Sequence, residues 1–506
     1  MNENLFSVLR AGFPDSDCCF IETGSGDIFT YGDMLRRSAQ YANALIGLGV
    51  KPGDRVAVQV EKSIESLMLY LGAIRAGAAF LPLNTAYTPA ELEYFLGDAE
   101  PVLVVCRPAM ESGVGAVSGE AVLETLGDSG VGGTLGALTD LASDVFDDTL
   151  CSAGDLAAIL YTSGTTGRAK GAMLSHGNLT SNAKALFETW AFTRGDRLLH
   201  ALPIYHTHGL FTATNTVLAA GASMIFLPKF DAGEVTALLP RASVMMGVPT
   251  FYSRLLQCDA LTKDALTHMR LFISGSAPLS PEVHSEFEKR TGHTILERYG
   301  MTETGMNTSN PYEGARRAGT VGFPLPGVEI RIADPETGSE LEQGEVGSIE
   351  VRGPNVFSGY WRMPEKTCEE FREDGFFITG DLGMIDEQGY VNIVGRDKDL
   401  IISGGFNVYP AEIEAAIDAI TGVAESAVIG APHPDFGESV VAVVARKSGQ
   451  SLAEEDIISP LGSILARYKQ PKRVFFVDAL PRNAMGKIQK KELREQYAGV
   501  FQPPRP

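Results

Sequence analysis

The chain has 506 residues, more than one ordinary domain contains, so we expect two or more domains. Its hydrophobic fraction of 44% and charged fraction of 21% are typical of a globular protein with a sizeable core and exclude a mainly disordered chain. The formal net charge of −21 argues against nucleic acid or an anionic membrane as a partner, because most of the surface repels phosphate.

The first part of the chain alternates helical and extended patterns from Tyr31 onward. Helices and strands take turns at residues 31–48, 55–60, 63–76, 79–81, 89–97 and 102–106. Further strands are predicted at 156–161, 224–227, 244–247 and 271–274. This alternation favours a mainly parallel sheet covered by helices. Residues 108–154 are rich in Gly, Ala, Ser and Asp, and we interpret them as a variable surface excursion that breaks the rhythm.

The pattern changes after Pro311. Short strands at 328–332, 347–351 and 389–394, separated by Gly, Pro and Asp turns, indicate a small antiparallel, barrel-like subdomain. Beyond Gly395 the chain predicts a compact α+β module with elements at 411–420, 426–430, 439–446, 454–467 and 473–477. We therefore expect an α/β fold. A large N-terminal domain at 1–397 combines mainly parallel sheets with the barrel-like subdomain, and a small mobile α+β domain follows at 398–506.

Three features bear on location. The longest apolar region, 67–83, contains Arg75, so we interpret it as a buried helix followed by a strand rather than a membrane span. The first ten residues have no apolar stretch of signal-peptide length, and the six cysteines form no C-x-x-C pair and are interpreted as free thiols. We therefore expect a cytoplasmic protein.

The strongest functional pattern is the segment Tyr161-Thr-Ser-Gly-Thr-Thr-Gly-Arg-Ala-Lys-Gly171, which follows an apolar run. Its glycines let the backbone approach an anion, its hydroxyls and N–H groups are donors, and Lys170 adds positive charge, so the segment predicts a triphosphate site. A P-loop kinase would need Lys directly after Gly167, where the chain has Arg168, so that alternative fails. The candidate ATP contacts are Thr162, Ser163, Gly164, Thr165, Thr166, Gly167 and Lys170.

This loop resembles the signature loop of the adenylate-forming acyl-CoA synthetase family, S-G-T-T-G-x-P-K-G, with Ala169 in place of the usual Pro. Five later motifs resemble that family in the same order: Y-G-M-T-E at 299–303, T-G-D at 379–381, G-R at 395–396, G-G-F-N-V-Y-P at 404–410 and P-R-N-A-M-G-K at 481–487. The resemblance spans nearly the whole chain. It implies that ATP and Mg²⁺ convert a carboxylic acid to an acyl-adenylate, whose acyl group passes to coenzyme A with release of AMP and pyrophosphate.

The resemblance also implies roles on the nucleotide side. Tyr299 stacks on adenine, Thr302 holds the α-phosphate, and Glu303 helps to hold Mg²⁺. Asp381 accepts hydrogen bonds from the ribose hydroxyls, and Arg396 supports the ribose.

The remaining motifs imply roles in the small domain. Lys487 is the catalytic lysine of adenylation, and acetylation by a lysine acetyltransferase would silence it by removing its charge. Lys398 matches the hinge between the two half-reactions, and the path of the coenzyme A thiol is implied to pass Gly404, Gly405 and Phe406.

The acid pocket is expected between residues 202–209, 272–278 and 297–301. Arg298 lies at the end of an apolar strand, and a buried arginine is costly without an anion, so a second carboxylate on the substrate would explain it. A structural pair with Glu297 is the alternative, although neighbours on a strand face opposite sides.

The segments I-Y-H-T-H-G and E-R-Y-G-M-T-E-T resemble the malonate-activating members of the family. By that likeness, Arg298 and Ser276 bind the distal carboxylate. Thr207 and Met306 bound the space at the α-carbon, where methylmalonate is also expected to fit. His206 orients the reacting carboxylate, because no proton has to be abstracted.

Three alternatives stay open. A medium- or long-chain fatty acyl-CoA synthetase would need an apolar tunnel, which Arg298 disfavours. An adenylation module that loads a carrier protein would keep every motif. A non-catalytic nucleotide-binding protein is disfavoured by the presence of Lys487 and Glu303.

Overall fold

The computed structural model describes residues 2–162, 169–403, 406–434, 436–462, 464–483 and 486–501. Contacts divide the chain into two compact units. The first comprises Met1–Ile330 and Val351–Phe377, and the second comprises Arg331–Glu350 and Ile378–Pro506. Packing thus groups the predicted barrel-like strands with the C-terminal residues. The predicted domain boundary at Lys398 is a boundary between parts that move relative to each other, and it stays a prediction.

The first unit contains a six-stranded sheet in the order β6-β5-β3-β4-β7-β8. Neighbouring strands run parallel, except that β8 is antiparallel to β7. Its strands are β3 (Arg55–Gln59), β4 (Ala79–Pro82), β5 (Leu103–Cys106), β6 (Val122–Thr125), β7 (Leu156–Thr162) and β8 (Lys170–Ser175). The connecting helices are α3 (Ile64–Arg75), α4 (Pro89–Ala99), η1 (Pro108–Met110), α5 (Glu111–Gly115) and α6 (Thr134–Leu141). This is the parallel arrangement that the alternation of helices and strands predicts.

A nine-stranded sheet forms the rest of the framework, in the order β15-β14-β13-β12-β11-β9-β10-β1-β2. Its strands are β1 (Cys19–Thr23), β2 (Ile28–Thr30), β9 (Arg197–His200), β10 (Ser223–Phe226), β11 (Val244–Gly247), β12 (Leu271–Ser274), β13 (Leu296–Met301), β14 (Gly305–Ser309) and β15 (Phe323–Pro324). The strands from β1 to β13 by way of β10, β9, β11 and β12 run parallel, so their carboxyl ends meet at one edge.

The helices of the first unit begin where their sequences supply caps. Thr30, Ser63, Thr88 and Ser175 each accept a hydrogen bond from a backbone N–H of the following turn, which satisfies one donor that the helix itself leaves open. The further helices are α1 (Leu5–Arg10), α2 (Tyr31–Gly47), α7 (His176–Thr189), η2 (His208–Asn215), α8 (Thr216–Ala220), α9 (Ala232–Leu238), η3 (Leu239–Arg241), α10 (Pro249–Leu255), η4 (Asp264–Leu266), α11 (Pro281–Thr291) and α12 (Pro364–Glu369).

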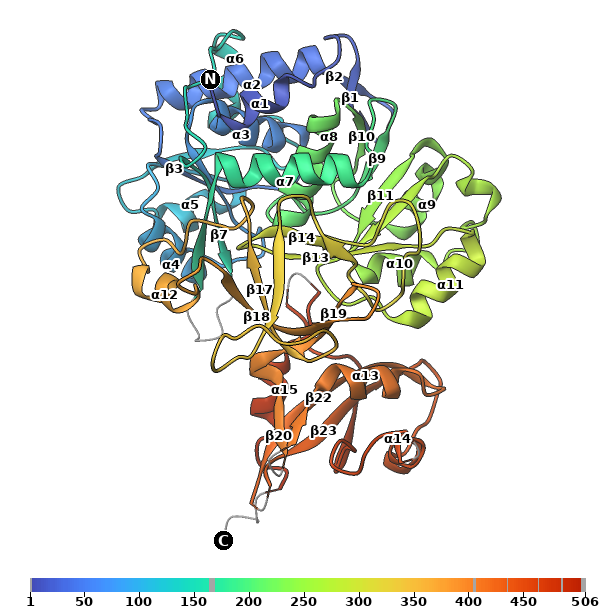
Figure 1. Ribbon diagram of the computed structural model, residues 1–506. Coiled ribbons are helices and arrows are strands. Elements are labelled where there is room, and N and C mark those ends of the chain that lie inside the picture. Colours follow the sequence, from blue (N-terminus) through green and yellow to red (C-terminus); the bar gives the residue numbers. More distant parts are fainter. Residues whose placement is uncertain are drawn as a thin grey trace. The chain divides into compact units, whose positions relative to one another are not determined.

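Helix α7 links the two sheets. It contacts β8 of the smaller sheet and β14 of the larger one, and Figure 1 shows it crossing the centre of the first unit. At its end the indole of Trp190 is fully buried and donates a hydrogen bond to Ser309 Oγ at 2.9 Å. One continuous core therefore holds both sheets at the edge where their functional segments emerge.

The second unit contains two sheets. Strands β16 (Glu329–Ala333), β17 (Gly347–Arg352), β18 (Phe377–Ile385) and β19 (Val391–Arg396) form one sheet in chain order. After η5 (Asp397–Asp399), the other sheet contains β20 (Ile401–Ser403), β21 (Phe406–Val408), β22 (Val423–His433), β23 (Gly437–Arg446) and β24 (Arg473–Val477), with helices α13 (Pro410–Asp418), α14 (Glu454–Leu461) and α15 (Lys490–Tyr497). Alternate residues of β22 and β23 enter two separate cores, as a sheet covered on both faces requires.

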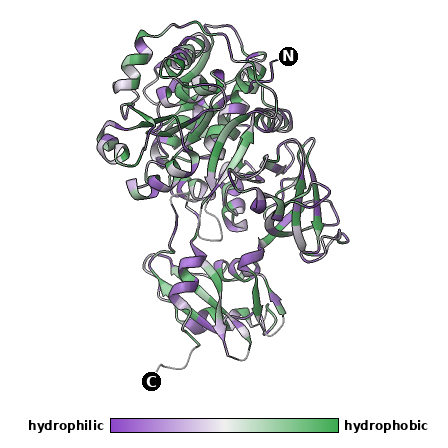
Figure 2. Cartoon of the chain, turned by 90° about the vertical axis from the view of Figure 1, so that its left-hand side faces the viewer, coloured by the Kyte–Doolittle hydropathy of each residue, from purple (hydrophilic) through white to green (hydrophobic). Residues whose placement is uncertain are grey.

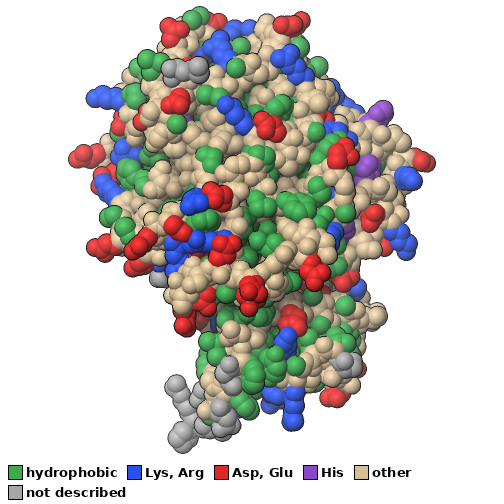
Figure 3. Space-filling model, in the orientation of Figure 1, with side chains coloured by type: hydrophobic (Ala, Val, Ile, Leu, Met, Phe, Trp, Pro, Cys, Tyr) green, Lys and Arg blue, Asp and Glu red, His purple; other side chains and the backbone are tan. Residues whose placement is uncertain are grey.

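Hydropathy and charge follow this layering. Figure 2 shows the strands mostly in hydrophobic colours and the helices with alternating hydrophilic and hydrophobic stretches. On the face seen in Figure 3, acidic side chains are spread among basic ones. Within the described residues, none of the helices combines the length and the apolar character that a membrane crossing needs.

Three details differ from the sequence-based expectations. Residues 108–154 continue the alternation, because β6 adds to the sheet edge in parallel register with β5. These elements have only three to eight residues, too few for a periodic pattern to stand out. The helix predicted to reach Arg467 ends at Leu461, directly after Pro460. The barrel-like subdomain is a four-stranded sheet in which β16 and β19 are the end strands, since so few short strands cannot close on themselves.

One buried carboxylate joins the amino ends of the parallel strands. Asp196 accepts hydrogen bonds from Arg270 Nε and Nη2 at 2.7 and 2.8 Å and from Ser243 Oγ at 2.7 Å, and these residues precede β12 and β11. Burial alone would raise the pKa of this carboxyl, but the bonds from Arg270, Ser243 and Thr193 outweigh burial and hold the pKa below its usual value. The ionised form of Asp196 therefore stabilises the start of three strands, β9, β11 and β12.

We predict that Asp196→Asn lowers the free energy of unfolding of the first unit by about 2–3 kcal/mol at pH 7, the scale of charge-assisted hydrogen bonds. Because the folded pKa is depressed, the contribution is complete above the unfolded pKa and is lost as pH falls through the folded pKa, so the difference between variant and wild type should shrink in acid. Urea unfolding followed by tryptophan fluorescence reports on this unit, which contains both tryptophans, Trp190 and Trp361. The exposed Asp140→Asn is the control, with an expected change under about 0.5 kcal/mol. An equal effect of both variants at pH 7 would contradict the role of Asp196.

Candidate active site

The candidate site lies where parallel strands of the nine-stranded sheet end. The segment 202–209 follows β9, the segment 275–278 follows β12, and β13 itself carries Glu297, Arg298 and Tyr299. Because β9, β11, β12 and β13 run parallel, these segments emerge at one edge, the usual place for ligands in open α/β sheets. The fold therefore brings together the three segments that were expected to form the acid pocket.

Arg298 is the most constrained charge in this region. Its side chain is buried, and its guanidinium covers the backbone of Gly275, where an added Cβ would lie 2.5 Å from Cζ, 2.6 Å from Nε and 2.7 Å from Nη1. Among the described residues, its Nε and Nη2 have no hydrogen-bond partner. Burial lowers the pKa of Arg298 to about 9, so the group keeps its charge at neutral pH. A buried cation with two unused donors is suited to an anionic ligand.

Glu297 does not neutralise this cation. Its carboxylate accepts a hydrogen bond from the backbone N–H of Gly319 at 3.1 Å, and burial raises its pKa to about 7. Neighbouring side chains on β13 point to opposite faces of the strand, as the sequence predicts. Within the described chain, the structural pair between Glu297 and Arg298 is therefore not formed.

Ser276 and His208 line the same side of the site. Ser276 Oγ lies 3.2 Å from His208 Nδ1, and the backbone of Ser276 has a φ of +73°, a strained value for a residue other than glycine. Burial and the positive charge of Arg298 hold the pKa of His208 well below its usual value. His208 is therefore neutral, and its Nε2 finds no partner within the described residues.

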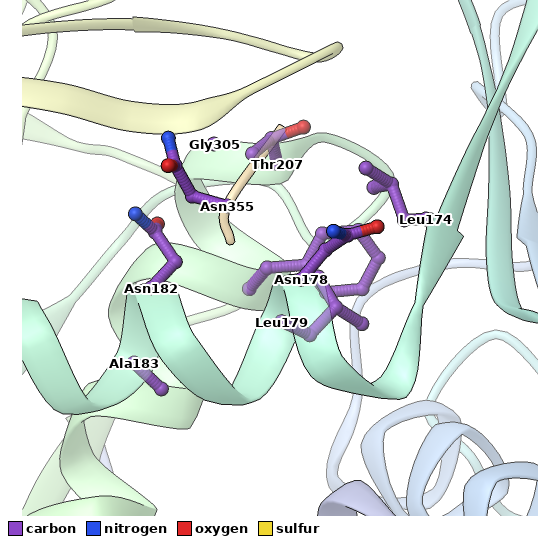
Figure 4. A pocket seen from close by; sticks show the side chains of 9 residues that line it. Leu174, Asn178, Leu179, Asn182, Ala183, Thr207, Gly305 and Asn355 are labelled. Atoms are coloured by element: carbon purple, nitrogen blue, oxygen red, sulfur yellow. The ribbon is translucent and has the colours of Figure 1, made fainter. Parts of the chain in front are cut away.

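Thr207 and Met306 each lie near Asn182 of α7. Both are buried, and Asn182 of α7 fixes the backbone of Met306 by accepting from its N–H at 3.1 Å and donating to its carbonyl at 2.8 Å. Figure 4 shows Thr207, Asn182 and Asn355 around a cavity of about 10 Å³ beside Gly305. That cavity has room for one water molecule and no more. Thr207 is therefore closely packed on the side that faces α7.

His206 lies one residue earlier and is half-buried. Its Nδ1 accepts a long hydrogen bond of 3.4 Å from the backbone N–H of His208. This contact orients the ring of His206. The role of His206 in the reaction stays a prediction.

The nucleotide side is built from β7, β8 and the turn after β13. Lys170 on β8 is buried, and its Nζ lies 2.8 Å from Glu370 Oε1. Glu303 Oε1 lies 3.4 Å from Thr162 Oγ1 and 3.1 Å from the hydroxyl of Tyr360. Tyr299 is buried on β13, and Thr302 is half-buried beside Glu303. The predicted loop contacts Ser163, Gly164, Thr165, Thr166 and Gly167 lie outside the described residues.

These residues fit Mg²⁺ bound together with a triphosphate. Glu303 supplies one carboxylate with a hydroxyl beside it, and the described part of the chain contains no cluster of three or more His, Cys, Asp or Glu side chains that could hold a metal. Mg²⁺ ordinarily binds through one or two carboxylates plus substrate phosphates, rather than in a cage of protein ligands.

In the second unit, Asp381 and Arg396 are cross-strand partners on β18 and β19. Arg396 Nε lies 2.6 Å from Asp381 Oδ1, and the backbone N–H of Asp381 donates to Thr379 Oγ1 at 3.1 Å. The two predicted ribose residues are thus brought together and oriented by Thr379.

The other predicted residues of the second unit lie in turns. Lys398 is exposed in η5, where its neighbour Asp399 pairs with Arg494 of α15 at 2.6 Å. Lys487 is exposed, and its backbone N–H donates to Asn483 Oδ1 at 3.0 Å.

The predicted thiol path is described only at Phe406, because Gly404 and Gly405 lie outside the described residues. Phe406 is 55% exposed and stacks on Tyr468 with ring centroids 4.7 Å apart. An exposed aromatic pair of this kind offers a flat apolar surface.

Sequence reasoning missed four residues of this site: His208, Gly275, Tyr360 and Glu370. His208 stands two positions from His206, and no pattern shows which ring faces inward. Gly275 lies in an expected pocket segment, but only the position of the Arg298 guanidinium shows why this residue is a glycine. Tyr360 and Glu370 follow the last site motif of the first unit, where no family motif was identified.

Comparisons with known proteins agree with this geometry. A model of the AMP-binding enzyme family matches residues 9–361, and a model of the AMP-binding enzyme C-terminal domain matches residues 412–487. The chain is 36% identical to a malonate–CoA ligase of Arabidopsis thaliana, over 97% of this chain and 89% of that protein. It is equally identical to a feruloyl-CoA synthase of Amycolatopsis, over 93% of this chain and 94% of that protein.

Among solved structures, the ATP-bound MatB of Rhodopseudomonas palustris is similar over 99% of this chain and 100% of that one. The sequence identity is 58% and the TM-score is 0.97.

We predict that Gly275→Ala weakens binding of malonate by roughly tenfold or more. The new Cβ would displace the guanidinium of Arg298, and one charge-assisted hydrogen bond contributes about 1.5–3 kcal/mol. Isothermal titration calorimetry with malonate in the presence of a non-hydrolysable ATP analogue measures the change. Gly97→Ala is the matched control, because a Cβ at Gly97 meets nothing within 4 Å. Unchanged malonate affinity in Gly275→Ala would show that the position of Arg298 does not matter for the ligand.

Proposed function

The chain belongs to the AMP-binding enzyme family, and we propose that it joins malonate to coenzyme A through a malonyl-adenylate, using ATP and releasing AMP and pyrophosphate. It is an AMP-forming acid–thiol ligase. The observation that carries the choice of acid is the buried guanidinium of Arg298, whose Nε and Nη2 have no partner in the described chain. Identity alone does not decide the substrate, because a feruloyl-CoA synthase is as similar as a malonate–CoA ligase.

The distal carboxylate of malonate matches Arg298. A carboxylate can accept two parallel N–H···O bonds from one guanidinium, which neutralises the buried charge and fixes the orientation of the acid. Ser276 would donate to the same carboxylate; in support, its hydroxyl contacts His208, a residue whose pKa is lowered by burial and by the charge of Arg298. A monocarboxylic acid would leave the guanidinium desolvated and unpaired, so the site should reject it.

The first half-reaction joins two anions. One oxygen of the proximal malonate carboxylate attacks the α-phosphorus of ATP, the bond to the β-phosphate oxygen breaks, and pyrophosphate leaves. His206 would orient the attacking carboxylate, and Thr302 and Lys487 would donate to the α-phosphate oxygens as charge builds on them. Bound Mg²⁺ would offset the negative charge of the phosphates, and Glu303 would hold it.

Further residues would position the nucleotide. Tyr299 would stack on adenine, while Asp381 would accept from the ribose hydroxyls with Arg396 beside it. Thr162, Lys170 and the loop between them would hold the β- and γ-phosphates.

The second half-reaction transfers the acyl group. The thiol of coenzyme A attacks the acyl carbon, the bond to the α-phosphate oxygen breaks, and AMP leaves. In our proposal Lys487 withdraws before this step because the chain turns at Lys398, and the thiol approaches past Gly404, Gly405 and Phe406.

Three finer points belong to the same proposal. Methylmalonate is a second substrate, by the resemblance of Thr207 and Met306 to the residues that bound the α-carbon in the malonate-activating members of the family. Acetylation of Lys487, which is exposed, silences the first half-reaction by removing its charge. The working compartment is the cytoplasm.

Arg298 also separates this proposal from its rivals. A fatty acyl-CoA synthetase or a feruloyl-CoA synthase must bury an apolar chain or ring where the guanidinium lies, at the full cost of an unpaired charge. A module that loads a carrier protein differs only in its acceptor, so thioester formation with free coenzyme A decides that case.

We predict that wild-type protein releases pyrophosphate with malonate far faster than with acetate, butyrate or ferulate. Arg298→Met should lose roughly 10²- to 10³-fold in kcat/KM for malonate, because breaking a buried charged pair costs about 3–5 kcal/mol. The same variant should gain relative activity on butyrate, while Arg298→Lys recovers little, since it lacks the two-pronged contact. A pyrophosphate-release assay with mass spectrometry of the acyl-CoA product measures both. An unchanged preference for malonate in Arg298→Met would remove the physical basis of the assignment.

We predict that Lys487→Ala slows adenylate formation by roughly 10²-fold or more, the scale of removing one transition-state donor. Thioester formation from preformed malonyl-adenylate and coenzyme A should proceed at close to the wild-type rate. Rapid-quench measurement of each half-reaction separates the two. Equal losses in both half-reactions would show that Lys487 is not specific to adenylation.

A further inference from the structure

A cluster of charges on the nucleotide side is not explained by the proposed roles. Lys170 Nζ lies 2.8 Å from Glu370 Oε1 and 4.0 Å from the centre of the Tyr360 ring, and the lysine side chain is only 11% exposed. The cation that should meet the anionic phosphates of ATP is thus held by an anion of the protein. An unpaired ammonium at this position would be unfavourable, because a buried ammonium loses its hydration.

Tyr360 couples this pair to the proposed metal-binding carboxylate. Its hydroxyl lies 2.7 Å from Glu370 Oε2 and 3.1 Å from Glu303 Oε1. A phenol has one proton and can donate to one carboxylate at a time, and the shorter contact is the one to Glu370. Burial and the two carboxylates raise the pKa of Tyr360, so the phenol stays protonated. The state of Glu370 therefore affects Lys170 directly and Glu303 through Tyr360.

Glu370 has a second cation within reach. Lys366, one turn earlier on α12, has its Nζ 3.2 Å from Glu370 Oε1, and it also contacts the exposed Glu369 at 2.9 Å. If Lys170 moved to a phosphate, Glu370 would keep Lys366 and the hydroxyl of Tyr360 as partners. The exchange would leave no buried charge unpaired at either stage.

We propose that Glu370 is a positioning residue for ATP, which holds Lys170 in place of the phosphates and releases it to them while Lys366 takes over as its partner. This inference rests on the proposed function, since it takes ATP as the ligand of Lys170. It predicts that Glu370 competes with the triphosphate for Lys170 and that Lys366 weakens this competition. The two side chains should therefore change ATP affinity in opposite directions, and Lys366 should act only through Glu370.

The test measures the dissociation constant of Mg·ATP by isothermal titration calorimetry without malonate, together with the KM for ATP and kcat in the complete reaction. Glu370→Gln should lower both the Kd and the KM by about two- to fivefold, the scale of one partly exposed ion pair. Lys366→Gln should raise both by a similar factor, with kcat changed by less than about twofold in either variant. Glu370→Asp, whose shorter carboxylate no longer reaches Lys170, should follow Glu370→Gln if the latter folds poorly.

Two comparisons separate the exchange from a general change of charge. Glu369→Gln removes the same charge one residue away and should leave the Kd within about 1.5-fold of wild type. In the double variant Glu370→Gln/Lys366→Gln, the effect of Lys366→Gln should disappear, because its only route to ATP has been removed. Additive effects in the double variant, or equal effects of Glu369→Gln and Glu370→Gln, would overturn the proposal.

The binding measurements also distinguish this inference from the proposed function. Opposite, non-additive shifts in ATP affinity would support the role of Glu370 even if malonate gave no pyrophosphate. Normal malonate activity with additive shifts would leave the function standing and remove the inference.

Discussion

A buried cation that has no anionic partner in the described part of the chain is the constraint on which the acid side of this molecule depends. The guanidinium of Arg298 covers the backbone of Gly275, so closely that a side chain at this position would have to displace it, and its Nε and Nη2 have no partner among the described residues. Burial and, after it, the charge of Arg298 hold the pKa of the neighbouring His208 well below its usual value. A ligand that supplies a carboxylate satisfies both unused donors at once, whereas an apolar ligand leaves them unpaired.

The nucleotide side meets the same physical problem in a different way. Lys170 is also buried, but Glu370 neutralises it, and Lys366 stands beside Glu370 as a second cation. The unpaired Arg298 suits an acid ligand, and the paired Lys170 suits ATP. Specificity for a small dicarboxylic acid benefits from a cation that waits unpaired, since every wrong acid is then penalised. The phosphates of ATP carry enough charge to compete with a carboxylate, so a paired lysine can still bind them.

Both arrangements depend on a framework that is fixed away from the site. Asp196 ties together the amino ends of the parallel strands, while the functional segments leave from their carboxyl ends. Helix α7 fixes the position of β14, because Asn182 accepts a hydrogen bond from the backbone N–H of Met306 and donates one to its carbonyl. Within the second unit, contacts of their own order the Asp381–Arg396 pair and the turn that carries Lys487.

The sequence by itself determined the elements with clear periodicity and the residues whose chemistry is local. The strands at Val244–Gly247, Leu271–Ser274 and Arg473–Val477 were predicted to the residue, because short apolar runs between turn signals have few other solutions. The sequence also identified Arg298 as a cation at the end of an apolar strand. The alternation of side chains along a strand predicted that Glu297 faces the opposite side. Only the tertiary structure decided which groups meet across the chain. It placed Gly275 under the guanidinium, turned His208 rather than His206 toward Ser276, and paired Lys170 with Glu370, 200 residues away. Such contacts join segments that are far apart in the sequence, and the local hydrophobic pattern of each segment carries no information about its partner. Only the packing of the two sheets around α7 sets the distances between these groups.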